Sequence, residues 1–85
     1  MSEGPGLKQV YKTGGDTSLI ELLQPNTRVW VDDRGPETIE GTFQGVFLDD
    51  LGKVAIIRSR KGYNMKVPLR ETTAGPYTIF AMEKR

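Results

Sequence analysis

The sequence contains no cysteine and no histidine. Without cysteine there are no disulfide bonds, thiolate metal sites or cysteine nucleophiles, and a reducing, cytoplasmic location is favoured. Without histidine the chain lacks the commonest general base and the commonest metal ligand. No glycine-rich phosphate loop is present either. We therefore expect a protein that is not an enzyme and that has no catalytic residues, metal or cofactor.

Long hydrophobic runs are also missing. No window approaches the roughly 20 apolar residues of a membrane helix, and the first residues have no apolar segment of signal-peptide length. We expect a protein that does not enter a membrane. The length of 85 residues corresponds to one domain with a thin core.

Charge is concentrated although the net charge is only +1. Residues 32–50 hold six acidic side chains and one arginine, whereas residues 51–70 hold six basic side chains and no acidic one: Lys53, Arg58, Arg60, Lys61, Lys66 and Arg70. The asymmetry indicates either surfaces of opposite charge or segments that pair across neighbouring strands.

Residues 1–15 are rich in glycine, and we interpret them as a flexible N-terminal arm. Leu7, Val10 and Tyr11 are apolar, so the alternative is that they dock as a short edge strand. The Gly14-Gly15 pair then marks a break. Residues 16–85 form the predicted single domain.

A short helix is predicted over residues 18–23, because Ser18 and Glu21 have the spacing of a capping box and Pro25 ends the segment. Strands are predicted over residues 28–32, 38–48, 54–60, 63–69 and 77–82. Gly41 and Gly45 indicate a bend or bulge, and Pro68 indicates an edge strand. The predicted fold class is mainly β, a small five-stranded barrel of bent strands with one short N-terminal helix.

Alternation assigns faces to the aromatic side chains. Phe43 and Phe47 fall on one face of the 38–48 strand. Trp30 lies opposite Val29 and Val31, so Arg28 and Trp30 are predicted to face outward as an interface. The alternative is a strand that is buried on both faces. Phe80 is predicted to belong to the core.

This order of elements resembles the Sm-like family, which includes Hfq and the archaeal and eukaryotic RNA-binding rings. Residues 18–23 match the family helix, residues 28–31 its first strand, residues 40–45 its glycine-containing second strand and residues 77–82 its last strand. The family's asparagine after Gly45 is absent, and Leu69-Arg70-Glu71 lacks the glycine of its second motif. A Src-homology-3-like barrel of the Tudor or KOW type fits the same strands.

The basic residues around Gly62 are the candidate nucleic-acid-binding site, because phosphates attract clustered cations and an aromatic ring stacks on bases. The predicted site residues are Arg58, Arg60, Lys61, Tyr63 and Lys66. The alternative is a solvated hairpin whose charges protect a sheet edge. Asp32-Asp33 and Asp49-Asp50 have turn chemistry rather than metal-ligand spacing.

The predicted function is non-catalytic nucleic-acid binding. The resemblance implies RNA rather than DNA as the partner and a homo-oligomeric ring as a possible assembly. The alternative is an interaction module that docks on a larger protein complex through Trp30 and the basic hairpin.

Overall fold

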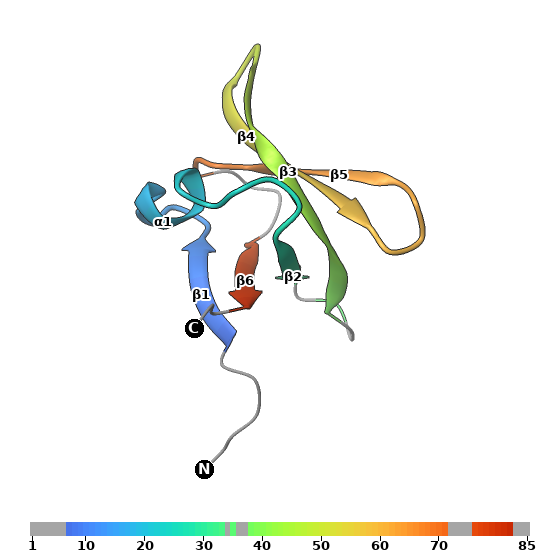
Figure 1. Ribbon diagram of the computed structural model, residues 1–85. Coiled ribbons are helices and arrows are strands. Elements are labelled where there is room, and N and C mark those ends of the chain that lie inside the picture. Colours follow the sequence, from blue (N-terminus) through green and yellow to red (C-terminus); the bar gives the residue numbers. More distant parts are fainter. Residues whose placement is uncertain (1–6, 34, 36–37, 72–75, 83–85) are drawn as a thin grey trace.

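The computed structural model describes residues 7–33, 35, 38–71 and 76–82 (Figure 1). One four-residue helix accompanies six strands in this part of the chain. The elements follow the order β1 (Leu7–Lys12), α1 (Ser18–Glu21), β2 (Arg28–Asp32), β3 (Ile39–Asp49), β4 (Gly52–Ser59), β5 (Asn64–Pro68) and β6 (Thr78–Met82). The fold is therefore mainly β, as predicted.

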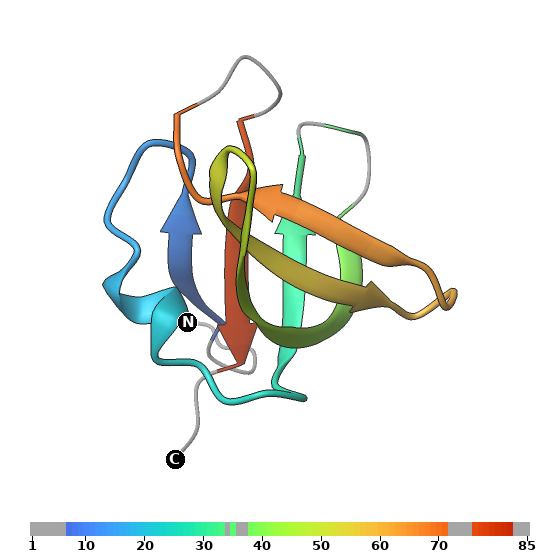
Figure 2. The same ribbon diagram turned by 90° about the horizontal axis from the view of Figure 1, so that it is seen from above.

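All neighbouring strands are antiparallel and form one sheet in the order β1-β6-β2-β3-β4-β5. The sheet is strongly curved, and β4 and β5 cross over β6 and β2 when the molecule is viewed from above (Figure 2). The two end strands, β1 and β5, are linked where the Tyr11 hydroxyl donates a hydrogen bond to the Pro68 carbonyl at 3.3 Å. The result is a bent-strand barrel that is not closed by a backbone ladder within the described residues.

Strand β1 corrects two predictions. In the described part of the chain the sheet has six strands rather than five, and residues 7–12 of the predicted flexible arm (residues 1–15) form a strand. This strand pairs with β6 and buries Val10 and Tyr11, so the alternative of an edge strand is confirmed. The register shifts between Gln9 and Tyr11, which is a β-bulge at Val10. The bulge turns two consecutive side chains inward and removes the alternation that would have marked a strand. Residues 1–6 lie outside the described residues.

Helix α1 ends at Glu21, earlier than predicted, and its start differs from a capping box. Thr17 is the N-cap residue and makes no side-chain cap bond; its hydroxyl donates to Glu21 Oε2 at 2.6 Å. The Ser18 hydroxyl and backbone N–H both donate to Asp16 Oδ1 instead. Ile20 is completely buried, so packing on the sheet holds this short helix in place.

Strand β3 bends where the sequence predicts it. Gly45 has a positive φ of 140°, and the register with β4 shifts between Phe43 and Gly45. The bulge brings Val46 against the core and leaves Phe47 50% exposed on the outside, so the prediction that Phe47 shares a face with Phe43 is wrong. A bulge reverses the alternation of every residue beyond it.

The core lies inside the curved sheet and under α1. Val29, Val31, Ile57, Val67 and Ile79 are completely buried in it. Trp30 and Phe80 are half-buried cross-strand partners, opposite the buried valines and opposite Ile79. The outward orientation of Trp30 is as predicted, whereas the prediction of a core Phe80 is wrong. Pro68 lies on the end strand β5, as expected for a residue that cannot donate to a ladder.

Candidate nucleic-acid interface

A row of polar side chains crosses four strands on the outer surface of the sheet. Arg28 pairs with Thr42, Thr42 with Arg58, and Arg58 with Asn64. Cross-strand partners share a face, and the neighbours Val29, Phe43 and Ile57 point into the core. Since adjacent strands are about 4.8 Å apart, the backbones of Arg28 and Arg58 are separated by roughly 10 Å.

A shallow hollow of about 470 Å³ lies over this row. Three arginines and one carboxylate line it. The Glu40 carboxylate forms one ion pair with Arg28 Nε at 3.4 Å and a second with Arg60 Nη1 at 3.4 Å. One carboxylate therefore faces three guanidinium groups, and the hollow keeps an excess of positive charge.

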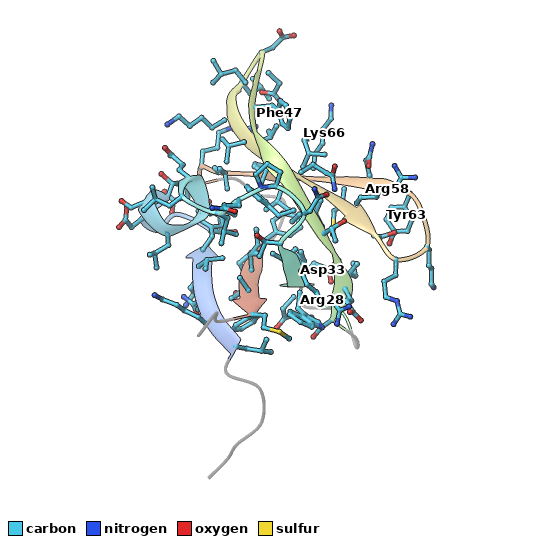
Figure 3. The ribbon with its side chains drawn as sticks, in the orientation of Figure 1. Arg28, Asp33, Phe47, Arg58, Tyr63 and Lys66 are labelled. Carbon is cyan, nitrogen blue, oxygen red and sulfur yellow. The ribbon has the colours of Figure 1, made fainter. Side chains whose placement is uncertain are left out.

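Arg58, which lines this hollow, and Lys66, which lies near it, have no acidic partner in the part of the chain that the structure describes. Among the described residues, no carboxylate lies within ion-pair distance of Arg58 or Lys66. Lys66 pairs with Ile56 on β4, one diagonal step from Arg58, and Figure 3 shows both side chains on the β4–β5 hairpin. We call Arg28, Arg58, Arg60 and Lys66 the outer basic face. The charges of Arg58 and Lys66 are available to a ligand.

An aromatic pair borders the outer basic face. Trp30 on β2 pairs with Phe80 on β6 and with Glu40 on β3. The two rings are half-buried, so part of each remains accessible beside the carboxylate that binds Arg28. The predicted interface residues Arg28 and Trp30 thus adjoin the predicted basic site, which the sequence treated as a separate surface.

Tyr63 lies on the other side of the β4–β5 hairpin. It is two residues before Met65, which packs against the core, and it is 50% exposed. Together with Lys61 and Arg60 it lines a second hollow of about 190 Å³. Glu40, Ser59 and Arg60 line both hollows, so the two adjoin at the edge of the hairpin. The structure therefore divides the five predicted residues between two connected surfaces, with Arg60 between them.

The other charged residues have local roles. Lys53 pairs with Glu21 at 3.0 Å, away from the outer basic face. The expectation that the acidic and basic segments pair holds for part of the charge, because Glu40 of the first pairs with Arg60 of the second. Asp49 and Asp33 each accept a backbone N–H two residues ahead, as turn residues do. No group of three His, Cys, Asp or Glu side chains comes together as a metal site in the described part of the chain.

Sequence reasoning missed Glu40 and Phe80 as members of the site. No motif around Glu40 or Phe80 identifies either residue as part of a site, because strand register determines which residues lie next to them on the surface. The alternation of β2 combined with a correct β2–β3 register would have placed Glu40 beside Arg28.

No protein-family model, curated protein sequence or solved structure matches the chain. Within the described residues, no helix is both long and apolar enough to cross a bilayer.

Proposed function

We propose that the protein is a non-catalytic nucleic-acid-binding barrel that takes a single strand across the outer basic face. The observation that carries the proposal is the surplus of cations there: Arg58 and Lys66 have no carboxylate partner in the described residues, and Arg28 and Arg60 share Glu40. Phosphates are the ligands that clustered, unpaired Arg and Lys side chains attract most strongly.

Aromatic side chains at both ends of this surface favour a single strand over a duplex. Trp30 lies two residues from Arg28 on β2 and pairs with Phe80 on β6, and Tyr63 lines the second hollow together with Arg60. Unpaired bases stack on such rings, with a gain of about 1–3 kcal/mol per base. A strand whose phosphates follow Arg58 and Arg28 has a ring within reach on either side. The preference for RNA over DNA rests on the resemblance to the Sm-like family.

Glu40 competes with a phosphate for Arg28 and Arg60. Binding therefore requires the two arginines to exchange a carboxylate for a phosphate oxygen, and removal of the carboxylate should make binding tighter. This expectation separates nucleic-acid binding from a purely structural role of the ion pairs, for which Glu40→Gln would leave affinity unchanged.

The test is fluorescence anisotropy with a short single-stranded RNA and the DNA of the same sequence at about 50 and 200 mM salt, the range over which phosphate contacts weaken. We expect salt-sensitive binding that weakens in Arg58→Ala and in Lys66→Ala, with the salt slope falling by about one for each lost contact. Glu40→Gln should bind more tightly than the unaltered protein.

Lys53→Ala is the matched control, because it removes the same charge from a lysine that already pairs with Glu21. An equal loss of affinity in Lys53→Ala and Arg58→Ala would mean that only net charge matters. Absence of binding at low salt would refute the proposal.

The alternative is that the same face docks on a larger protein complex. The half-exposed pair of Trp30 and Phe80 favours it, because aromatic rings are common anchors of protein interfaces. No oligonucleotide binding, together with an intact fold, would leave this alternative in place.

A further inference from the structure

The tip of the β3–β4 hairpin, residues 47–52, exposes three large apolar side chains. Phe47, Leu48 and Leu51 are 50%, 78% and 70% exposed. Figure 1 shows the hairpin rising clear of the rest of the sheet. Soluble proteins expose single apolar residues commonly, but a cluster at one projecting point is typical of an interaction site.

The tip is ordered before it meets any partner. The β3–β4 ladder continues to the pair Asp49 and Gly52, which leaves a two-residue loop. Asp49 Oδ1 accepts a hydrogen bond from the Leu51 backbone N–H at 2.8 Å and holds the turn. Docking of a preformed tip costs little conformational entropy.

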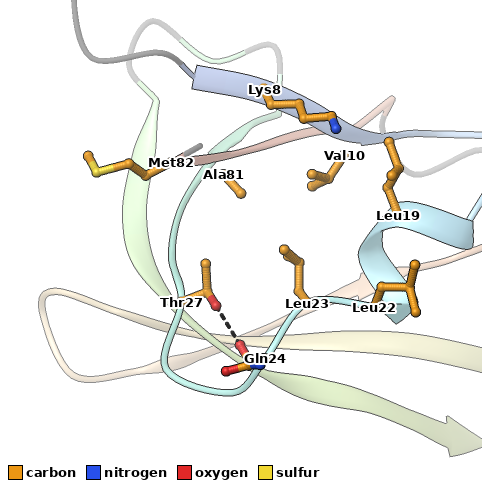
Figure 4. A pocket seen from close by; sticks show the side chains of 9 residues that line it. All are labelled: Lys8, Val10, Leu19, Leu22, Leu23, Gln24, Thr27, Ala81 and Met82. Atoms are coloured by element: carbon orange, nitrogen blue, oxygen red, sulfur yellow. Dashed lines mark hydrogen bonds between the residues drawn. The ribbon is translucent and has the colours of Figure 1, made fainter. Parts of the chain in front are cut away.

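A groove that is apolar like the tip lies between α1 and the strands β1 and β6 (Figure 4). Its volume is about 430 Å³, and Leu19 and Leu22 on its rim are 42% and 78% exposed. Apolar side chains make up most of its lining: Val10, Leu19, Leu22, Leu23, Ala81 and Met82. We call it the apolar groove.

The tip of a chain does not reach the apolar groove of the same chain. In Figure 1 the tip rises on the opposite side of α1 from β1 and β6, which line the groove. Strand pairing up to Asp49 and Gly52 prevents the hairpin from folding back. The tip can therefore enter an apolar groove only in another molecule.

Charge distinguishes between possible occupants. Asp49 and Asp50 lie between Leu48 and Leu51 in the tip, and Lys8 lies on the rim of the groove. No ion pair to any of these three residues occurs among the described residues. The acidic tip matches a groove with a lysine on its rim and disfavours an anionic lipid surface.

We propose that the tip of one copy docks into the apolar groove of a second copy. The contact joins two different surfaces, so it is head-to-tail, and repetition gives a ring if the rotation closes or a filament if it does not. It requires no pairing of sheet edges and is independent of the outer basic face.

The test is sedimentation velocity over a range of protein concentrations. We expect concentration-dependent association of the unaltered chain, and a loss of about tenfold or more in the association constant for the tip variant Leu48→Asp and for the groove variant Leu22→Asp. Both positions are 78% exposed, so circular dichroism should show an unchanged fold. Leu7→Asp is the matched control, because Leu7 is exposed and does not line the groove.

Mixing the two variants gives the decisive result. The tip variant keeps an intact groove and the groove variant keeps an intact tip, so the mixture should form a one-to-one heterodimer and stop there. A charge exchange tests the orientation: Lys8→Glu should weaken association, and Asp50→Lys in the same chain should restore it.

Several outcomes would overturn the proposal. They are a monomer at every concentration, association that survives Leu48→Asp, or variants that fail to assemble when mixed. A monomer that binds lipid vesicles or a different protein through Leu48 would also overturn it.

Discussion

At the scale of single residues, Tyr11 has the most consequential position. Its side chain is only 2% exposed, and its hydroxyl donates to the Pro68 carbonyl and accepts a bond from the Gly14 N–H at 3.4 Å. It therefore ties the two end strands of the sheet together. Burial raises the pKa of Tyr11, and the bond from Gly14 and the positive charge of Arg70 oppose that rise without cancelling it.

The pKa of Tyr11 predicts a loss of stability in alkali. Because its pKa is raised on folding, the neutral phenol contributes stability that is fully present below about pH 10 and is lost as pH rises through the folded-state pKa. Tyr11→Phe should cost about 1 kcal/mol at neutral pH through the lost hydrogen bond, and it should show a shallower decline above about pH 10. Urea unfolding at both pH values checks this.

Tyr63→Phe is the control, because Tyr63 is half exposed and makes no side-chain hydrogen bond among the described residues. It should follow the unaltered protein at every pH. If Tyr11→Phe also declined in parallel with the unaltered protein, burial of the phenol would not govern alkaline stability.

Gly41 illustrates a close approach of two strands. A Cβ atom built at this position would overlap the backbone carbonyl oxygen of Arg58 on β4. Gly62 differs, since its φ of 101° favours glycine but nothing lies within 4 Å of an added Cβ. Gly41 is therefore required by the close approach of two strands, and Gly62 is favoured by its backbone conformation.

Gly41→Ala should destabilise the protein by about 1–3 kcal/mol, because two backbones must separate. Gly62→Ala should cost about 1 kcal/mol from backbone strain alone. Thermal unfolding of both variants measures the difference. Equal effects would mean that the β3–β4 approach at Gly41 is looser than the structure shows.

At the scale of elements, β1 decides how the sheet ends. It pairs with one edge of β6, while β2 pairs with the other, so both edges of β6 are occupied. The bulge at Val10 brings Val10 and Tyr11 into the core together. The strand therefore acts as part of the barrel rather than as an attachment to it.

Val10→Ala should lower the free energy of unfolding by about 1–3 kcal/mol, because the side chain is 5% exposed and its removal leaves a cavity. Gln9→Ala, on the exposed neighbour, should change it by less than about 0.5 kcal/mol. Chemical denaturation gives both values. No difference between the two variants would restore the interpretation of residues 1–15 as an arm.

At the scale of the whole molecule, charge and apolar exposure occupy separate surfaces. The outer basic face spans β2 to β5, whereas the tip and the apolar groove involve the end of the β3–β4 hairpin, α1 and the β1–β6 edge. The small net charge of +1 thus conceals a positive surface with little acidic compensation.

This separation predicts that the two proposed activities are independent. Leu48→Asp should leave the affinity of a single copy for a short oligonucleotide unchanged, and Arg58→Ala should leave self-association unchanged, since distant sites are usually additive. Anisotropy below the self-association range and sedimentation velocity provide the two measurements. A change in both properties from either substitution would indicate one shared surface.

Residue patterns alone predicted the mainly β class, the short helix, the bend at Gly45, the edge position of Pro68 and the outward side of Trp30. These features follow from alternation, proline and glycine, which act over a few neighbouring residues.

Other features became visible once the strands were placed side by side: the sixth strand, the outward positions of Phe47 and Phe80, and the ion pairs of Glu40 with Arg28 and Arg60. Each depends on which strand lies alongside and in what register. A bulge or an ion pair between strands is set by a partner far away in the chain, and the pattern of neighbouring residues does not contain it.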